Sequence, residues 1–348
     1  RYWVKQSNKS NSLPGKKLSH PLLNSKQSFS GKDQVYHSQL SLDHQAYLHD
    51  HQVFGHVILP GAGFVELMLA ALSDAQESLS LKNISIDCAL KLDDDESSQL
   101  QVIRSSDSEA DVITVYSEQE AGVWQQHAAA QLGHAEFDFS LHINIPAYHE
   151  KGERKGIADF YAQLSTDGIY YGLDFQVVKQ CFELDSGLLA QVQVQGNVEN
   201  YLAHPALLDG CLQVAGLAIA SQNANESFDA MVPIGIESLQ LVSRLGQSVW
   251  VWIDFAEVSI TEQDAQASIS ILDESGRAIG LVQGLQCQRV TQSQLESVLG
   301  LKQDVSDWFY QWQWRELAYQ EAELDVHSIL KINMIMILTK HGAVKMTH

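Results

Sequence analysis

A short segment near the start of the chain holds a histidine upstream of a glycine and a proline. His51 lies four residues before Gly55 and nine before Pro60, and an apolar stretch from Phe64 to Ala71 follows. A neutral imidazole exists near pH 7 and can act as a base. Glycines and a helix start leave backbone N–H groups free, and such donors stabilise a developing oxyanion. The segment therefore predicts a base beside an oxyanion site.

A second segment places a carboxyl group in apolar surroundings. Asp209 follows the run Pro205-Ala206-Leu207-Leu208, and Gln213 stands four residues further on. In a helix this spacing puts Gln213 one turn later, within hydrogen-bond reach of the carboxyl group. Desolvation raises the pKa of a buried carboxyl, so Asp209 can hold a proton and serve as an acid.

A third segment, Gly168-Ile169-Tyr170-Tyr171-Gly172-Leu173-Asp174-Phe175, carries a tyrosine and two glycines. Together, the three segments resemble the dehydratase domains of modular polyketide synthases and animal-type fatty acid synthases. The family's motifs are His-x-x-x-Gly-x-x-x-x-Pro, Tyr-Gly-x-x-Phe and Asp-x-x-x-Gln/His, and all three occur here in family order. The resemblance covers roughly His20 to Val290. One departure is Leu173, which stands where the family often has proline and leaves the channel shape in question.

The resemblance implies dehydration of a 3-hydroxyacyl thioester, which needs a base, an acid and an oxyanion donor. His51 is expected to remove the α-proton and Asp209 to protonate the departing β-hydroxyl. The backbone N–H of Gly55 is the family's candidate donor to the thioester oxygen, and Pro60 would fix the loop that aims it. Tyr171 is expected to line the channel or contact the β-hydroxyl. For Gln213, support of Asp209 and simple packing both remain open.

The remaining elements predict how these residues are held. Alternating strands are expected at 34–42, 84–90, 99–104, 111–117, 123–132, 175–184, 188–194, 236–241, 249–256, 267–272 and 278–290, with long apolar helices at 63–75 and 205–220 and a shorter one at 157–164. Each half is thus a set of mostly antiparallel strands around one apolar helix. This is the α+β double hot-dog fold that the resemblance implies.

The domain boundaries follow changes in composition. Residues 1–18 are predicted to be a linker from a preceding acyltransferase region, since Arg1-Tyr2-Trp3 resembles the end of that linker in polyketide synthases. The two hot-dog halves are expected at 19–140 and 157–295, joined by a polar linker at 141–156. Residues 296–348 are expected to form a segment after the dehydratase or the start of the next region.

Composition limits the partners. The 348-residue chain has a net charge of −21, which opposes a main role in nucleic-acid binding. Its four cysteines contain no Cys-x-x-Cys pair and suit free thiols in a reducing cytoplasm. No apolar run reaches the roughly 20 residues of a membrane span. The basic stretch before Asp33 is a solvated linker or a docking site for an acidic carrier protein. The resemblance implies an acyl carrier protein as partner, other domains of the same synthase, a homodimer, and no cofactor beyond the carrier's phosphopantetheine.

Several other interpretations compete with the dehydratase. His49 and His51 on one face of a strand would offer two metal ligands, but no third ligand has suitable spacing, so no metal is expected. The same fold and His–Asp pair also serve pyran-forming cyclisation and double-bond migration. A degenerate domain that acts only as a spacer or carrier-docking module is the non-enzymatic alternative. The intact set of His51, Gly55, Pro60, Asp209 and Gln213 argues against the degenerate domain. Double-bond isomerases tend to lose the aspartate or the proline, and both are present here, whereas a pyran-forming domain stays an open alternative.

Overall fold

The computed structural model describes residues 15–30, 33–75, 77–94, 96–106, 111–134, 139–222, 231–261, 264–299, 335–338 and 344–347. A compact unit ends at Leu295. In the segment beyond it, β19 (Ile335–Leu338) pairs antiparallel with β20 (Val344–Thr347). The sequence Arg1-Tyr2-Trp3 lies outside the described residues.

The compact unit has two halves of similar plan. In chain order, the first contains β1 (Lys16–Lys17), β2 (Ser25–Ser28), β3 (Gln34–Leu40), η1 (Ala46–Asp50), β4 (His51–Val53), β5 (His56–Val57), α1 (Gly61–Asp74), β6 (Ser80–Ile86), β7 (Ser98–Ser106), β8 (Asp111–Glu120) and β9 (Val123–Leu132). The second contains α2 (Ile145–Lys151), β10 (Glu153–Arg154), α3 (Ile157–Thr166), β11 (Ile169–Tyr171), β12 (Val178–Leu184), β13 (Gly187–Gln193), α4 (Pro205–Gln222), β14 (Met231–Leu241), β15 (Ser248–Asp254), η2 (Phe255–Glu257), β16 (Ser259–Ile260), β17 (Asp264–Leu272) and β18 (Ala278–Arg289). Helix α5 (Gln292–Val298) begins in this unit and ends three residues beyond Leu295.

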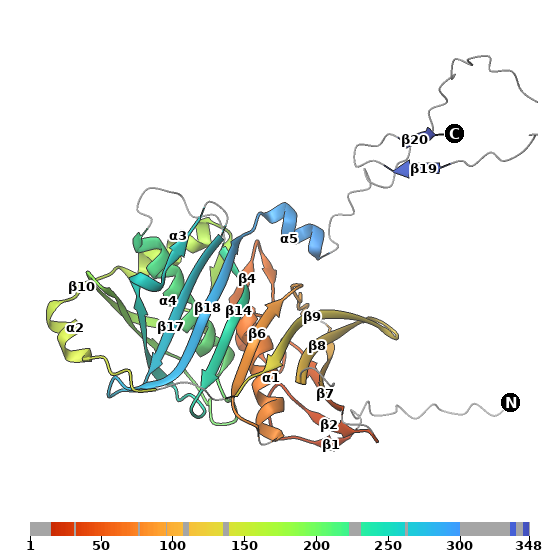
Figure 1. Cartoon of the computed structure of the whole chain (residues 1–348), viewed down its shortest axis with the longest axis horizontal. Coiled ribbons are helices and arrows are strands. Elements are labelled where there is room, and N and C mark those ends of the chain that lie inside the picture. The colour runs from red at the N-terminus through yellow and green to blue at the C-terminus, as the bar shows by residue number, and fades with distance from the viewer. Residues whose placement is uncertain are drawn as a thin grey trace, which may run out of the picture. The chain divides into compact units, whose positions relative to one another are not determined.

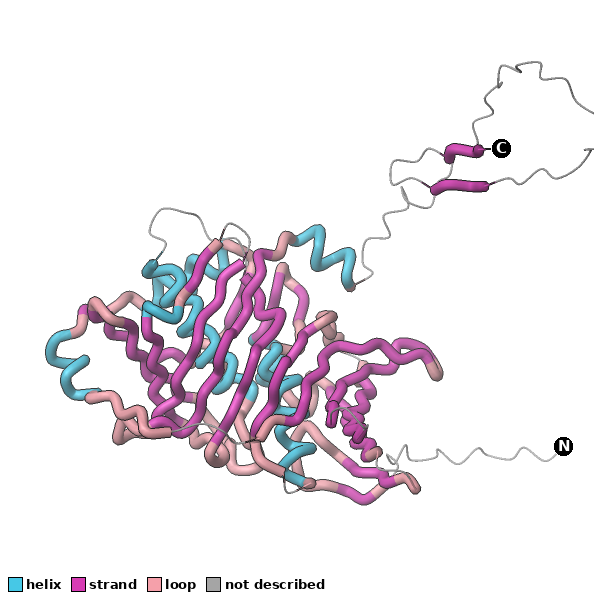
Figure 2. The backbone as a smooth tube through the Cα atoms, viewed as in Figure 1, coloured by secondary structure: helices cyan, strands magenta, loops and turns pink. Residues whose placement is uncertain are grey.

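One antiparallel sheet runs through both halves. Its strand order is β1-β2-β3-β7-β8-β9-β6-β14-β18-β17-β15-β13-β12-β10, with β16 beside β17. The halves join where β6 pairs with β14, with Ile84 opposite Ile236 and Leu81 opposite Leu239. Helix α1 packs against β6, β7 and β8, and α4 packs against β13, β15 and β17 (Figure 1). Figure 2 shows the same helices on the inner side of the curved strands.

The two long helices are buried because they are apolar on every side. Every residue of α1 from Ala62 to Leu72 is buried, and so is every residue of α4 from Pro205 to Ala215. A helix without a polar face is stable only when it is covered all round, here by the sheet and by the other helix. The same helices carry a few buried polar side chains, among them Glu66, Asp209 and Gln213.

Several predicted strand boundaries were wrong, and β14, expected at 236–241, begins five residues earlier at Met231. The strand expected from Phe175 begins only at Val178, because the amides of Phe175 and Gln176 both donate to the carbonyl of Gly172 in a turn. The strand expected at 84–90 runs instead from Ser80 to Ile86. The segment 141–156, expected as a linker, contains α2 and β10, and β10 pairs with β12.

Candidate active site

A small sheet joins the first and third sequence motifs. Strand β11 of the second half pairs antiparallel with β4 of the first, and β4 pairs with β5. In this register Tyr171 stands opposite His51. The pairing brings together residues 120 positions apart and fixes the backbone of the candidate base against the second half.

The turn after β4 depends on Gly55. Phe54 and Gly55 both have positive φ, 48° and 78°, as a tight two-residue hairpin turn requires. Glycine adopts this conformation at no steric cost. Gly55 is exposed at the tip of this hairpin, whereas Pro60 is buried at the N-cap of α1. The structure therefore places both residues on the two connections that flank β5.

His51 is buried and has a defined tautomer. Its Nδ1 lies 2.8 Å from the carbonyl oxygen of Ile58, and a carbonyl can only accept, so Nδ1 carries the proton. The lone pair of a neutral ring is then on Nε2, which lies 4.0 Å from Oδ1 of Asp209. The rings of Tyr171 and Phe175 pack against the imidazole, with centroids at 5.5 and 5.1 Å. This arrangement presents an unprotonated nitrogen to the carboxyl group.

Asp209 lies in the first half of α4 with 4% of its surface exposed. Burial raises the pKa of this carboxyl, while the nearby His51 and hydrogen bonds from Gln213 and Tyr171 act in the opposite direction. The net shift is upward, which favours the protonated acid. Oδ2 accepts a hydrogen bond of 2.8 Å from the Gln213 amide, so Oδ1 is the oxygen turned toward His51.

Tyr161 on α3 orients Gln213, and nothing in the sequence indicated this role. The backbone N–H of Val178 donates to the Tyr161 hydroxyl at 3.2 Å, and that hydroxyl donates to Oε1 of Gln213 at 2.8 Å. The Gln213 NH₂ group then donates to Asp209 and, at 3.1 Å, to the carbonyl of Phe175. All partners of the amide are therefore assigned, and its nitrogen can face only Asp209 and Phe175.

Asp50 holds the loop after Tyr171, a second role that the sequence did not reveal. Its carbonyl accepts from the Gly172 amide, and its Oδ2 accepts from the Asp174 amide, both at 2.8 Å. A Cβ at position 172 would lie 2.2 Å from the Asp50 carboxyl carbon, so only glycine fits there. Leu173, which stands where the family often has proline, is 85% exposed, and its side chain points into solvent.

A cavity of about 110 Å³ opens beside Asp209. It follows one face of α4 from Asp209 to Ala220, eleven residues or roughly 16 Å at 1.5 Å per residue. Its wall is mostly apolar and is formed by Phe160, Gln163, Leu164, Asp167, Ile169, Tyr171, Leu212, Gln213, Gly216, Ile219, Met231, Pro233 and Cys287 as well as those two residues. The cavity suits an extended apolar chain whose reacting end lies at Asp209.

His49 and His51, a pair for which no metal is expected, do not share a strand. His49 belongs to the 3₁₀ turn η1, and its Nδ1 lies 3.5 Å from the Asp94 carboxylate. Within the described ranges, no three His, Cys, Asp or Glu side chains form a group that could hold a metal ion. No helix in the described part of the chain has the length and apolarity needed to cross a bilayer.

Comparison with known proteins assigns the family. The model of the polyketide synthase dehydratase domain matches residues 20–118, and that of the polyketide synthase dehydratase N-terminal domain matches 148–297. The chain belongs to the polyketide synthase dehydratase family. It is 26% identical over 309 residues to a phenolphthiocerol/phthiocerol polyketide synthase protein of Mycobacterium tuberculosis, covering 83% of this chain and 16% of that protein. It is 30% identical over 282 residues to the type I synthase Pks15/1 of Mycobacterium bovis, covering 78% and 13%. The chain thus spans about a sixth or less of these relatives.

Solved dehydratase domains share the fold. The dehydratase from the CurK module of curacin polyketide synthase superimposes with a TM-score of 0.69 at 25% identity, over 79% of this chain and 99% of that one. The CurH dehydratase gives a TM-score of 0.70 at 21% identity, over 79% and 99%. The predicted double hot-dog architecture is therefore confirmed for this dehydratase family member. Two further CurK structures, at 26% and 25% identity and TM-scores of 0.67, are inactive variants, one histidine-to-phenylalanine and one aspartate-to-asparagine.

Proposed function

We propose that this domain removes water from a 3-hydroxyacyl thioester carried on the phosphopantetheine arm of an acyl carrier protein and gives the trans 2-enoyl thioester. One observation carries the proposal: the unprotonated Nε2 of His51 faces Oδ1 of a carboxyl group whose pKa is raised by burial. A base and an acid thus face each other at 4.0 Å in a water-poor site.

The proposed reaction transfers two protons in opposite directions. His51 Nε2 takes the proton from the α-carbon, the α-carbon electrons form the double bond, and the β-carbon–oxygen bond breaks. Asp209 Oδ1 gives its proton to the departing oxygen, which leaves as water. Afterward His51 is protonated and Asp209 is ionised, so one proton returned from His51 to Asp209 restores the starting state. The 4.0 Å separation is short enough for one water or hydroxyl group to relay that proton.

Gly55 and Pro60 complete the proposal on the thioester side. The Gly55 N–H is the proposed donor to the thioester oxygen, and its position in a rigid two-residue turn without a side chain supports close approach of the substrate. A Cβ at this position would meet no atom within 4 Å, so the space beside it is open. Pro60 fixes the connection that follows, at the start of α1.

The inactive CurK variants support the same pair of residues. In that relative, loss of one histidine or one aspartate accompanies inactivity. His51 and Asp209 are the His and Asp that face each other at 4.0 Å in the present structure, with Asp209 in the cavity wall, and we assign them the corresponding roles. The same proposal includes three partners: the acyl carrier protein, the neighbouring synthase domains and a second copy of the chain. It also includes a cytoplasmic location and no cofactor beyond the carrier's pantetheine arm.

The direct test is intact-mass analysis of a carrier protein loaded with a (3R)-3-hydroxyacyl chain. Loss of one water is expected with the native domain and not with His51→Ala or Asp209→Asn. An exposed substitution on the same strand pair, Tyr170→Phe, is the control and should leave turnover unchanged, since Tyr170 is 48% exposed. An unaltered mass with the native domain and a range of acyl lengths would refute the proposal.

A further inference from the structure

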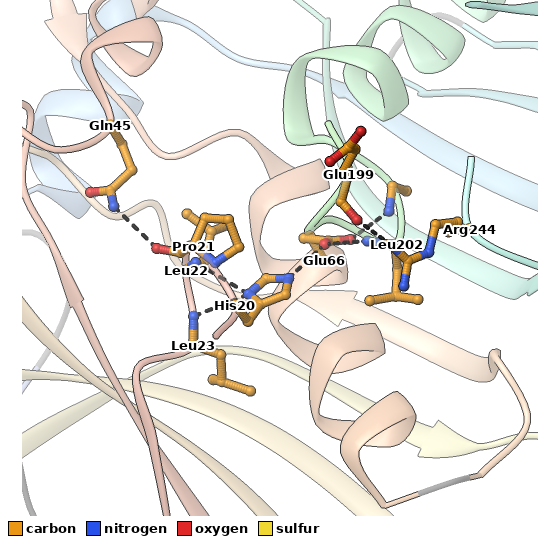
Figure 3. Close-up of polar contacts among 10 residues, drawn as sticks. His20, Pro21, Leu22, Leu23, Gln45, Glu66, Glu199, Leu202 and Arg244 are labelled. Carbon is orange, nitrogen blue, oxygen red and sulfur yellow. Dashed lines mark hydrogen bonds and ion pairs between the residues drawn. The ribbon is translucent and has the colours of Figure 1, made fainter. Parts of the chain in front are cut away.

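Glu66 is a fully buried carboxylate in the middle of α1 that the proposed reaction does not use. None of its surface is exposed. Oε1 accepts from Nε2 of His20 at 2.9 Å and from the Leu202 amide at 2.8 Å, and Oε2 accepts from the Ala203 amide at 2.8 Å. Figure 3 shows the carboxylate between the segment at His20 and the chain at Leu202.

The three contacts all require an acceptor. Nδ1 of His20 accepts from the amides of Leu22 and Leu23, at 3.2 and 3.1 Å, so the ring proton is on Nε2 and is donated to Glu66. Two backbone amides supply the other donors. An ionised carboxylate accepts from all three donors and has no proton that needs an acceptor of its own, so the contact set fits the ionised form, although burial raises the pKa of the group. The site is therefore an anion held by three N–H groups.

The elements that Glu66 connects adjoin those that carry the two candidate catalytic groups. Helix α1 starts at Gly61, directly after the segment whose Ile58 carbonyl orients His51. Leu202 and Ala203 lie just before α4, whose first turns carry Asp209. The loop is also held from its other side, since the Leu245 amide donates to the Leu202 carbonyl at 2.7 Å. Glu66 thus connects α1, which follows the segment that orients His51, to the chain just before α4, which carries Asp209.

A residue with a packing role alone would have no need of a charge. Replacing a buried ion pair by apolar side chains of similar volume is often neutral or stabilising, so charge in a core is weak evidence for stability. A carboxylate here instead fixes two specific backbone amides across the junction of the halves. Hydrogen bonds have narrow distance and angle limits, and they transmit a defined spacing that apolar contact does not.

We propose that Glu66 is a positioning residue that sets the separation of His51 and Asp209 by gripping the backbone at Leu202 and Ala203. The catalytic consequence rests on the proposed dehydratase function, but the hydrogen bonds from Leu202 and Ala203 to Glu66 do not. Misplacement of a reacting group by about 1 Å can cost up to about a hundredfold in rate.

The test compares Glu66→Gln with Tyr36→Phe. Glutamine keeps the volume and one acceptor but turns an N–H toward a donor. The Tyr36 hydroxyl also anchors α1, bonding the Ala71 carbonyl at 3.2 Å, but at the far end of the helix. Amide hydrogen exchange of the segment 202–209 is expected to speed up about tenfold or more in Glu66→Gln and to stay unchanged in Tyr36→Phe. Turnover of the loaded carrier should fall about ten- to a hundredfold in kcat for Glu66→Gln, with KM within about threefold.

The outcomes separate the two proposals. Unchanged amide exchange at 202–209 in Glu66→Gln refutes the claim that Glu66 holds the backbone at Leu202 and Ala203, whether or not the native domain is active. Faster exchange with unaltered kcat overturns the positioning role in an active domain. If the native domain dehydrates nothing, the proposed function fails, and a crystal structure of Glu66→Gln decides the positioning, since an unchanged distance between His51 Nε2 and Asp209 Oδ1 refutes it. Should Glu66→Gln not fold, His20→Asn removes one donor while keeping an acceptor for the Leu22 and Leu23 amides, and smaller changes of the same sign are expected.

Discussion

Replacing Tyr161 by phenylalanine removes one oxygen from the network behind Asp209. That oxygen accepts from the Val178 amide and donates to Oε1 of Gln213. Both partners are left buried without this hydrogen bond, and each such loss costs about 1–3 kcal/mol, so the free energy of unfolding should fall by roughly 2–6 kcal/mol. The Gln213 amide is then free to flip, which would turn its oxygen against Asp209 and weaken the support of the acid.

The expected kinetic effect of Tyr161→Phe is a decrease of about tenfold in kcat, equivalent to about 1.4 kcal/mol in the activation barrier. KM should change little, because Tyr161 does not line the cavity. Urea unfolding measures the free energy of unfolding, and turnover of a pantetheine-bound 3-hydroxyacyl substrate measures kcat and KM. Tyr170→Phe, at an exposed position, is the control. A destabilised Tyr161→Phe variant with native kcat would refute the reasoning, because it would separate Gln213 orientation from catalysis.

Three further predictions concern pH and packing. The Gln213 N–H favours the ionised form of Asp209, so Gln213→Leu should raise the pKa of Asp209. The alkaline limb of the pH profile of kcat/KM should then move to higher pH, and the maximum of the profile should be lower. An alkaline limb that moves to lower pH contradicts this prediction. Gly172→Ala should cost about 1–3 kcal/mol of stability through its clash with the Asp50 carboxyl, and thermal unfolding should show a smaller loss when Asp50→Ala is present as well. Burial lowers the pKa of His204 from 6.5 to about 4, so the folded state binds fewer protons than the unfolded state between these values. The free energy of unfolding is therefore undiminished by His204 above pH 6.5 and decreases as the pH falls toward 4, by about 3 kcal/mol at most. Between pH 7 and pH 4, the free energy of unfolding should depend less steeply on pH in His204→Asn than in the native chain. An equal slope in the two proteins would exclude His204 as the source of the pH dependence.

The sequence predicted the parts of the fold that depend on local pattern. The long helices lack a polar face, and a helix of this kind must be covered, so the wrapped architecture followed from composition along each segment. The hydrogen bond between Asp209 and Gln213 followed from helical spacing alone and is present at 2.8 Å.

The contacts missed from the sequence cross long distances along the chain. Tyr161, Asp50 and Glu66 each act through a backbone group or side chain more than 50 residues away or in another element. Their residue types are ordinary for a helix or a turn, so local pattern carries no signal for these roles.

The pairing of β4 with β11 limits how such domains can be recombined. A chimera that takes its first half from one synthase and its second half from another would replace the strand opposite His51 as well as the cavity wall. His51 and Asp50 would then come from one parent, and Tyr171 and Gly172, which lie against them, from the other. Crossover points outside the span from His20 to Leu295 keep these contacts together, so in module engineering the whole compact unit, rather than either half, is the exchangeable part.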